Sequence, residues 1–360
     1  MHHSTGLRSA PPAPTGASRR HRLVALVALG AVALVASVGP ATASGPLKVC
    51  ATCTYTDISA ALAAAAAQSG EETIQIEAGS YPPSAFTVST NVSLIGAGAG
   101  LTTIGGVNVD AGVSVTIKGV TITNVSGGPG DDRGVRNAGA LTLKNCVVSG
   151  NAADAAAGIL NLSTGTVTLQ DSTVTGNSAF LGSGGGIFNA GAMTLQNSTV
   201  SANGTFGAGG GIFNSGTLLL QGSAVSNNGA FGSGGGIFNE GTVTLRDSTV
   251  SENLAVFDGG GGIYNSAAGT TTMRNSTVSG NTLDGPPADG GGISNFGTLS
   301  LSDSTVSGNH ASNRGGGIYN GATGTGTLTK STVSANTAVI GPGIYNDGGT
   351  ITLRDSTVQA

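Results

Sequence analysis

Short runs in which apolar and polar residues alternate follow one another along most of the chain. In residues 166–169 (TVTL) and 172–175 (STVT), valine and leucine alternate with threonine. A period of two places the apolar side chains on the inner face of a strand and the threonines on the outer face. Gly, Asn and Ser separate the runs. The pattern therefore predicts many short strands joined by tight turns.

One phrase, for example GGGIFNSGTLLLQGSAVSNNGAFGS, recurs from about residue 134 to the end of the chain, and its opening apolar residue returns every 24 to 30 residues. A repeat this short, with strands of three to five residues, has no room for a helix, so each repeat predicts one all-β coil. We expect an all-β solenoid, a parallel β-helix of about 11 coils and roughly 50 Å, with a short N-terminal capping helix. The opening residues are Val135, Ile159, Ile187, Ile212, Ile237, Ile263, Ile293, Ile318 and Ile344.

The variation in repeat length is confined mainly to one loop. From the opening residue to the Asn of the following S-x-N phrase the count is always 16 or 18, whereas from that Asn to the next opening residue it runs from 8 to 12. Insertions on one edge of a solenoid often build its functional face. We therefore expect any specific site to lie on the loop edge that precedes each GGG.

Each repeat also carries an asparagine two residues after the opening residue. Stacked coils place equivalent residues about 4.8 Å apart, and Asn both tolerates left-handed turns and bonds to the Asn above and below. We expect a structural ladder in preference to a catalytic role. Its members are Asn137, Asn161, Asn189, Asn214, Asn239, Asn265, Asn295, Asn320 and Asn346.

Residues 1–43 have the pattern of an export signal. Arg19, Arg20 and Arg22 precede an apolar run at residues 23–38, and Ala41-Thr42-Ala43 offers a cleavage site. Because the run is shorter than the roughly 20 residues of a spanning helix, we expect a secreted or cell-surface protein with no membrane span after signal removal. Residues 18–20 leave the choice between general and twin-arginine export open.

The rest of the chain divides into three parts. Residues 44–72 predict an N-terminal cap whose helix lies between Thr56 and Gly70, because Thr56 or Asp57 can begin the helix and Gly70 can end it. Residues 73–133 predict irregular first coils, and residues 134–360 the regular repeats, which end within a repeat. An uncovered coil exposes strand edges, so we expect either self-association through the open C-terminal coil or a chain that is a fragment of a longer repeat protein.

Composition narrows the classes of partner. The chain has 63 glycines, no Trp and 9% charged residues, and all 18 acidic but only 10 of the 14 basic residues follow the signal. An acidic mature chain disfavours binding to nucleic acid. Cys50 and Cys53 predict a local disulfide, since a zinc site or a redox motif would need further partners. Cys146 aligns with a column of serines and is expected to be a small buried residue.

The GGxI phrases, the helix, TIQIEAGSY at residues 73–81 and VSLIGAG at residues 92–98 resemble the pectin-lyase-like superfamily of right-handed parallel β-helices. Among its members, the repeats look most like those of polymorphic outer-membrane and adhesin-type surface proteins. The resemblance covers roughly residues 50 to 360 and implies a right-handed coil. It implies no single function, since the same scaffold carries lyases, hydrolases, adhesins and spacers.

One group of charges lies on the variable edge. Asp289 and Arg314 each stand four residues before an opening Ile, and Asp258 stands five before. Stacked coils bring such residues within about 5 Å per coil, where they could hold Ca²⁺ or bind an acidic sugar. A surface ion-pair ladder explains the same residues and is the favoured interpretation. Asp284, in the longest loop, and His310, the only histidine after the signal, are further candidate ligand-binding residues.

If the chain is an enzyme, the resemblance implies a polysaccharide lyase with bound calcium and an arginine base, or a hydrolase with two acids. Asp258, Asp289 and Arg314 would be its catalytic residues, and Asp258 and Asp289 the calcium ligands. The chain lacks Gly-His-Gly and Trp, and these absences disfavour a hydrolase and an extended sugar groove. No cofactor is required by the pattern.

Three functions follow, in order of preference. The first is a structural or adhesive module that binds a carbohydrate or another cell-surface ligand. The second is a polysaccharide lyase or hydrolase acting on acidic glycans. The third is an ice-binding solenoid, suggested by outward pairs such as Thr173/Thr175 and Thr249/Ser251, although Thr is also a common exposed strand residue.

Overall fold

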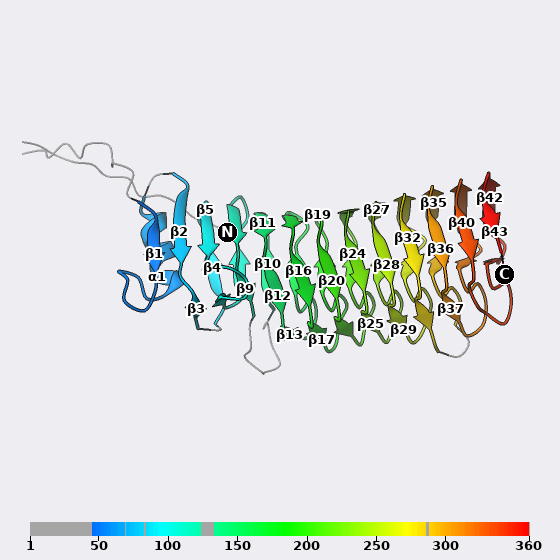
Figure 1. Ribbon diagram of the computed structural model, residues 1–360, viewed down its shortest axis with the longest axis horizontal. Coiled ribbons are helices and arrows are strands. Elements are labelled where there is room, and N and C mark those ends of the chain that lie inside the picture. Colours follow the sequence, from blue (N-terminus) through cyan, green and yellow to red (C-terminus); the bar gives the residue numbers. More distant parts are fainter. Residues whose placement is uncertain (1–44, 69, 83, 124–132, 286–287, 360) are drawn as a thin grey trace, which may run out of the picture. The chain divides into compact units, whose positions relative to one another are not determined.

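The computed structural model describes residues 45–359 except 69, 83, 124–132 and 286–287, and these residues belong to one compact unit, Gly45–Ala360. The expected export signal lies outside the described residues. Within the unit, the chain winds as a right-handed parallel β-helix, and the strands of successive coils lie side by side (Figure 1). The predicted fold is confirmed.

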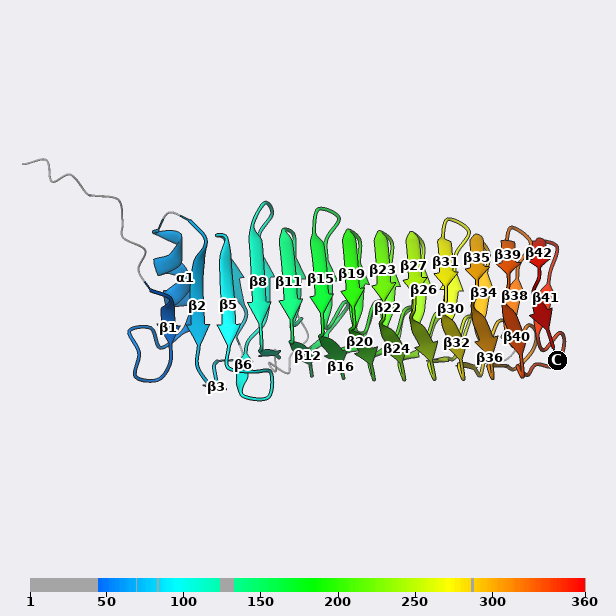
Figure 2. The same cartoon turned by 45° about the horizontal axis from the view of Figure 1, so that its top comes forward.

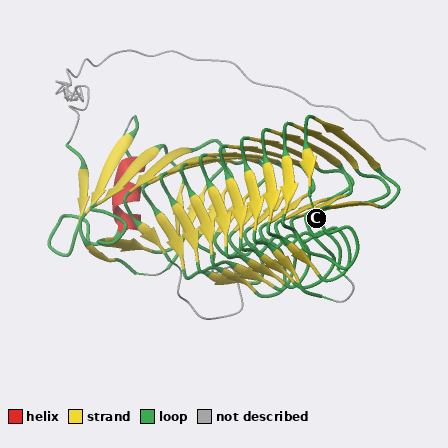
Figure 3. Ribbon diagram, turned by 45° about the vertical axis from the view of Figure 1, so that its right-hand side comes forward, coloured by secondary structure: helices red, strands yellow, loops and turns green. Residues whose placement is uncertain are grey.

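Among the described residues there is one helix, α1 (Ile58–Ala66), which follows the first strand near the start of this unit (Figure 3). The Asp57 carboxylate accepts a hydrogen bond of 2.8 Å from the Ala60 amide, which caps the helix as the sequence predicts. Ile58, Ala61 and Leu62 are buried and join the core that the first coils form. The helix therefore covers apolar side chains at the start of the β-helix.

Sheet A contains the longest strands, most of five residues, and Figure 2 shows them side by side along the coil. Thr, Ser or Ala alternates with buried Val, Leu, Ile or Met in most of these strands, as the period of two predicts. Its strands, in order, are β1 (Leu47–Val49), β2 (Glu72–Ile76), β5 (Val92–Gly96), β8 (Ser114–Lys118), β11 (Ala140–Lys144), β15 (Thr166–Gln170), β19 (Ala192–Gln196), β23 (Thr217–Gln221), β27 (Thr242–Arg246), β31 (Thr270–Arg274), β35 (Thr298–Ser302), β39 (Thr325–Thr329) and β42 (Thr350–Arg354).

Sheet B follows sheet A in each regular coil after a sharp corner. The corner residue is Asn, Asp, Gly or Lys with φ between 47° and 58°, a left-handed conformation that Gly, Asn and Asp adopt at low cost. The strands of sheet B are β3 (Gly79–Ser80), β6 (Thr102–Ile104), β9 (Thr121–Ile122), β12 (Val147–Ser149), β16 (Thr173–Thr175), β20 (Thr199–Ser201), β24 (Ala224–Ser226), β28 (Thr249–Ser251), β32 (Thr277–Ser279), β36 (Thr305–Ser307), β40 (Thr332–Ser334) and β43 (Thr357–Val358).

Sheet C begins each repeat at the opening apolar residue and ends at the predicted asparagine ladder. The GGG that precedes it is needed for close packing: a Cβ on Gly186 would lie 2.7 Å from the carbonyl oxygen of Gly211 in the next coil. The strands of sheet C are β4 (Phe86–Val88), β7 (Val107–Val109), β10 (Val135–Asn137), β14 (Ile159–Asn161), β18 (Ile187–Asn189), β22 (Ile212–Asn214), β26 (Ile237–Asn239), β30 (Ile263–Asn265), β34 (Ile293–Asn295), β38 (Ile318–Asn320) and β41 (Ile344–Asn346).

Sheet D was not predicted from the sequence, because its strands have only two residues and show no alternation. It lies between sheet B and the variable loop. Its strands are β13 (Ala152–Ala153), β17 (Ser178–Ala179), β21 (Gly204–Thr205), β25 (Gly229–Ala230), β29 (Leu254–Ala255), β33 (Thr282–Leu283) and β37 (His310–Ala311). The coil number also differs slightly, since sheet B has 12 strands where about 11 coils were expected.

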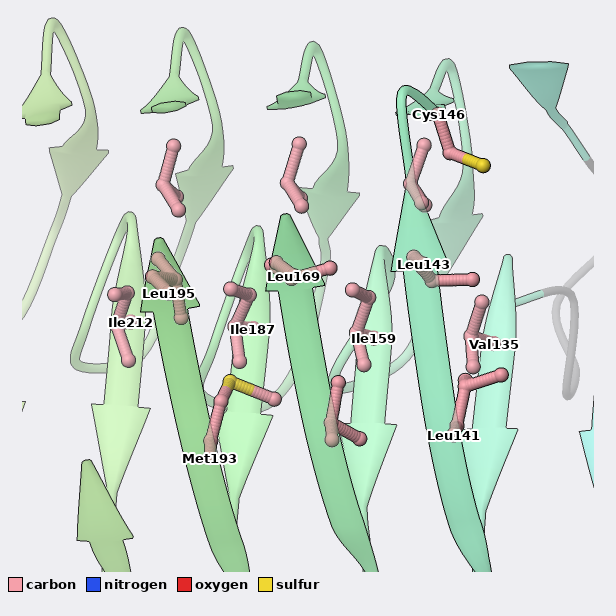
Figure 4. Close-up of a cluster of buried hydrophobic side chains, with 14 of the residues drawn as sticks. Val135, Leu141, Leu143, Cys146, Ile159, Leu169, Ile187, Met193, Leu195 and Ile212 are labelled. Atoms are coloured by element: carbon pink, nitrogen blue, oxygen red, sulfur yellow. The ribbon is translucent and has the colours of Figure 1, made fainter. Parts of the chain in front are cut away.

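The core consists of columns of identical or similar residues. Ile159, Ile187 and Ile212 pair in register from coil to coil, and all three are fully buried. Figure 4 shows this column beside a second one that contains Leu169 and Leu195. Strict register is expected, because a shift by one residue would turn every apolar side chain outward.

The asparagine ladder is confirmed and continuous. Asn189 Nδ2 donates to Asn214 Oδ1 at 2.7 Å, and Asn214 Nδ2 donates to Asn239 Oδ1 at 2.9 Å. A second ladder, which the sequence did not reveal as one, runs through the Asn of the S-x-N phrase: Asn203 Nδ2 donates to Asn228 Oδ1 at 3.0 Å. Each ladder therefore joins successive coils through bonds between buried amide side chains, which would be costly to bury without partners.

The cysteines lie where the sequence placed them. Cys50 and Cys53 form a disulfide, and Cys146 is buried within the serine column, where its amide donates to Ser172 Oγ at 3.1 Å. Within the described ranges, the structure contains no helix with the length and apolar character needed to cross a bilayer. Self-association through the last coil stays a prediction.

Candidate functional site

Aromatic side chains form an outward column on sheet C and the turns that follow it. Ring centroids of Phe188 and Phe213 lie 4.7 Å apart, and those of Phe238 and Tyr264 4.9 Å apart, with interplanar angles of 11° and 3°. Rings stacked in this way cover one another's faces and leave mainly their edges to solvent. The column, called the aromatic ladder, comprises Phe188, Phe213, Phe238, Tyr264, Phe296, Tyr319 and Tyr345.

The aromatic ladder is interrupted at Ser294. In β34 this serine takes the position that Tyr264 and Tyr319 occupy in the neighbouring strands β30 and β38. It is buried, and its hydroxyl donates to the Asp289 carbonyl oxygen at 2.5 Å. Phe296, two residues later, partly fills the space, but its ring is tilted by 37° to Tyr264 and by 53° to Tyr319. Ring faces that are covered elsewhere in the column are therefore partly uncovered here.

A pocket of about 300 Å³ lies at this interruption. It coincides with the longest of the variable loops, which precedes β34, so one wall comes from loop residues and the other from the tilted rings. We call it the ladder pocket. It is lined by Phe257, Asp258, Gly285, Ala288, Asp289, Phe296 and Tyr319.

Asp289 and Arg314 form the ion pair that their spacing predicts. Arg314 donates to Asp289 Oδ2 through one terminal nitrogen at 2.7 Å and to Oδ1 through Nε at 3.2 Å. Asp289 Oδ1 also accepts from the Arg314 amide at 3.1 Å and from Asn313 Nδ2 at 2.8 Å. The carboxylate is thus held as a hydrogen-bond acceptor by four donors.

Arg314 also contacts its own coil and the next one. Its other terminal nitrogen lies 3.2 Å from Asp347 Oδ2, which accepts a 2.7 Å bond from the Tyr319 hydroxyl. The guanidinium carbon lies 5.3 Å from the ring centroid of Tyr319 and 5.0 Å from that of Tyr345, within the range of cation–π attraction. One cation therefore joins two carboxylates and two rings.

These contacts raise the pKa values of the Arg314 and Tyr319 side chains. The hydrogen bond to Asp289, then the one to Tyr345, raises the pKa of Arg314 above its usual value. Burial, then the hydrogen bond to Asp347, raises the pKa of Tyr319. An arginine whose cationic form is stabilised is a poor general base. The geometry consequently disfavours lyase chemistry with Arg314 as the base.

Asp258 faces the same pocket but differs from Asp289. It is exposed, has a left-handed backbone with φ 68°, and makes no hydrogen bond or ion pair with the described residues. Burial, and secondarily the charge of Asp258, raises the pKa of Tyr264. Asp258 is therefore an acceptor available to a ligand, whereas Asp289 is already occupied.

The other candidates lie apart from these. Asp284 is exposed and does not line the pocket, and His310, in β37, is exposed with its Nδ1 2.8 Å from Thr337 Oγ1. Among the described residues, Asp258 and Asp289 have no third His, Cys, Asp or Glu close enough to complete a metal-binding group. Calcium binding stays a prediction, with these two side chains as its ligands.

Sequence reasoning missed the aromatic part of the site. The few Phe and Tyr residues were interpreted as removing stacking surfaces, yet three of them line the ladder pocket. The available signal was the phrase ISN at residues 293–295, where six of the eight other repeats have IFN or IYN, directly after the longest variable loop.

Comparison with known proteins supports the fold. Residues 105–278, just under half of the chain, match the family model described as "Right handed beta helix region". This match agrees with the β-helix scaffold expected from the sequence, whereas the closer relation to adhesin-type surface proteins stays a prediction. No curated protein matches the sequence.

Three solved structures illustrate how distant the resemblance is. The catalytic unit of an α-1,3-glucanase from Streptomyces thermodiastaticus has 17% identity and a TM-score of 0.49, over 89% of this chain and 70% of that one. The A-module of an Azotobacter vinelandii mannuronan C-5 epimerase has 15% identity and a TM-score of 0.43, over 84% and 95%. The Agl-KA catalytic domain has 13% identity and a TM-score of 0.43. The match covers 82% of this chain but only 64% of that domain.

Proposed function

We propose that this chain is an exported β-helix protein that binds a glycan in the ladder pocket. The observation that carries the proposal is the combination of three aromatic rings and two carboxylates around one recess. Pyranose rings have apolar C–H faces that pack on aromatic rings, and their hydroxyls donate to carboxylates. The volume of about 300 Å³ lies at the lower end of the range for small-molecule sites. The rod would then be an interaction module whose ligand is a carbohydrate.

The interruption of the aromatic ladder makes this position different from the rest of the rod. Elsewhere the rings stack nearly parallel and offer few faces, whereas Phe296 and Tyr319 are tilted by 53° to each other. Asp258, whose carboxylate is available to accept hydrogen bonds from a ligand, lines the same pocket. Export and a cell-surface or secreted location are part of the proposal, and they rest on the export-signal pattern of residues 1–43.

Binding is tested by electrophoresis through gels that contain a soluble polysaccharide and by sedimentation with insoluble α-1,3-glucan, cellulose or chitin. We expect Asp258→Asn to weaken retention about tenfold or more, since a hydrogen bond to a charged group contributes about 1.5–3 kcal/mol. Ser294→Phe restores the ring of the neighbouring coils and is expected to close the pocket.

The matched control is Asp303→Asn. Asp303 is also exposed and also has a left-handed backbone, with φ 51°, but it lies on the corner between sheets A and B. This variant should be retained like the parent protein. Retention that both Asp variants lower equally, or that neither lowers, would contradict a site at the ladder pocket.

A polysaccharide hydrolase is the second candidate, because Asp258 and Asp289 line the same pocket and glycoside hydrolysis uses two carboxyl groups. Release of new reducing ends from the bound polymer, abolished by both Asp258→Asn and Asp289→Asn but not by Asp303→Asn, would establish the enzyme. Binding without release of reducing ends would leave the binding module as the function.

A further inference from the structure

A second recess lies on the same edge of the β-helix. It has a volume of about 260 Å³ and is lined by Gly204, Thr205, Phe206, Gly229, Ala230, Phe231, Leu254 and Val256. We call it the phenylalanine groove. Phe206 and Phe231 are 60% and 49% exposed, and their ring centroids lie 4.8 Å apart. Exposed apolar patches that extend over several residues mark interaction surfaces.

The phenylalanine groove and the ladder pocket are lined by consecutive residues on adjacent coils. Val256 lines the groove, and the next residues, Phe257 and Asp258, line the pocket. The Phe257 amide donates to the Phe231 carbonyl oxygen at 2.9 Å, so Phe257 lies on the coil adjacent to Phe231. From Phe206 to Asp289 the two recesses extend over four successive coils, about 15 Å along the axis at the usual strand spacing. A single sugar ring cannot span this length.

The charges along this path favour an uncharged ligand. Every residue that lines the phenylalanine groove is uncharged. At the ladder pocket, Arg314 is already paired with Asp289 and Asp347, and Asp258 adds a further negative charge. A polymer of uronic acids would meet an excess of carboxylates, and like charges across an interface are unfavourable. An acidic glycan is therefore the poorer match.

We infer that the ligand is an uncharged polysaccharide whose chain occupies the ladder pocket and continues along the axis into the phenylalanine groove. This inference rests on the proposed function and specifies its ligand. In the groove, the apolar C–H faces of the sugar rings pack against the exposed apolar side chains of Phe206, Phe231 and Leu254, while the sugar hydroxyls remain in water. In the pocket, hydroxyls donate to Asp258.

The test is a titration calorimetry series with neutral oligosaccharides of α-1,3-glucan, β-1,4-mannan and β-1,4-xylan, from disaccharide to hexasaccharide, and with oligogalacturonates of the same lengths. For the parent protein we expect the affinity for a neutral series to rise at least about tenfold with length. The Phe231→Ala variant should lose this gain and keep the affinity for the disaccharide.

Phe180→Ala is the matched control, because Phe180 is 50% exposed on the same edge but lines neither recess. It should behave like the parent. Because Phe231 is exposed, we expect Phe231→Ala to fold like the parent protein. Its circular dichroism spectrum should therefore match that of the parent, and a difference would reveal misfolding. Light scattering of each variant then shows whether the substitution changes association between copies of the chain.

Each contrary result has a distinct meaning. If no oligosaccharide or polymer binds, the proposed function fails and the inference with it. If a glycan binds through Asp258 but oligogalacturonates bind more tightly, if affinity does not depend on length, or if Phe231→Ala and Phe180→Ala behave alike, the inference alone fails. It also fails if Phe231→Ala abolishes a dimer and leaves glycan affinity unchanged at every length.

Discussion

Replacing Asn239 by alanine tests how the asparagine ladder holds the coils together. Its side chain is fully buried. Nδ2 donates to Asn265 Oδ1, Gly241 O and Thr270 O at 2.9, 3.2 and 3.1 Å, and Oδ1 accepts from Asn214 Nδ2 at 2.9 Å and from the Gly241 amide at 3.1 Å. These bonds use the two N–H donors and the two acceptor lone pairs of the amide. At about 1 kcal/mol for each of these four sites, the variant should lose about 3–4 kcal/mol of unfolding free energy.

Asn346→Ala is the control at the exposed end of the same ladder. Asn346 accepts from Asn320 at 2.7 Å and donates to Gly349 at 2.8 Å, but it is exposed, so water can replace these bonds. We expect a loss of about 1 kcal/mol or less. Urea unfolding followed by far-ultraviolet circular dichroism compares the two variants. Equal losses, or a loss below about 1 kcal/mol for Asn239→Ala, would refute the reasoning that buried amides depend on their neighbours.

Three further results are expected. Because the pKa of Tyr319 is raised in the folded state, its contribution to stability is present below the usual tyrosine pKa of about 10 and lost as pH rises through the folded value; Tyr319→Phe should flatten the alkaline decline in unfolding free energy. Cys146 is buried and burial raises its pKa, so a thiol reagent should label it at the rate of unfolding, and fast labelling in native buffer would contradict its burial. Gly241→Ala should prevent regular stacking, because the new Cβ would lie 2.1 Å from the Gly216 carbonyl oxygen, whereas Gly100→Ala, with no atom within 4 Å, should leave the melting temperature unchanged.

The regular features of the fold could be predicted because each one follows from a residue pattern that repeats in every coil. The alternation in residues 166–169, the asparagine ladder and the Asp289–Arg314 pair all follow once equivalent positions are stacked. Sheet D was missed because strands of two residues, such as β29, carry no period. The Asn of the S-x-N phrase was recognised as a landmark but not as a second ladder, since its buried side-chain contacts cannot be inferred from spacing.

The candidate site could be predicted only in part. Spacing brought Asp258, Asp289 and Arg314 to one edge, and the structure places them around or beside one pocket. The pocket itself depends on the tilt of Phe296 into the space left by Ser294, and ring orientation does not follow from periodicity. A missing ring in a repeated column is nevertheless a sequence signal that can be sought in other solenoids.

A crystal structure of the protein with a neutral tetrasaccharide that it binds in calorimetry would test glycan binding in the ladder pocket most directly. We predict sugar density in the ladder pocket, with one ring against Phe296 or Tyr319, a hydroxyl within hydrogen-bond distance of Asp258, and the polysaccharide chain extending toward Phe231. Sugar density on another face of the β-helix, with the ladder pocket free of sugar, would contradict it.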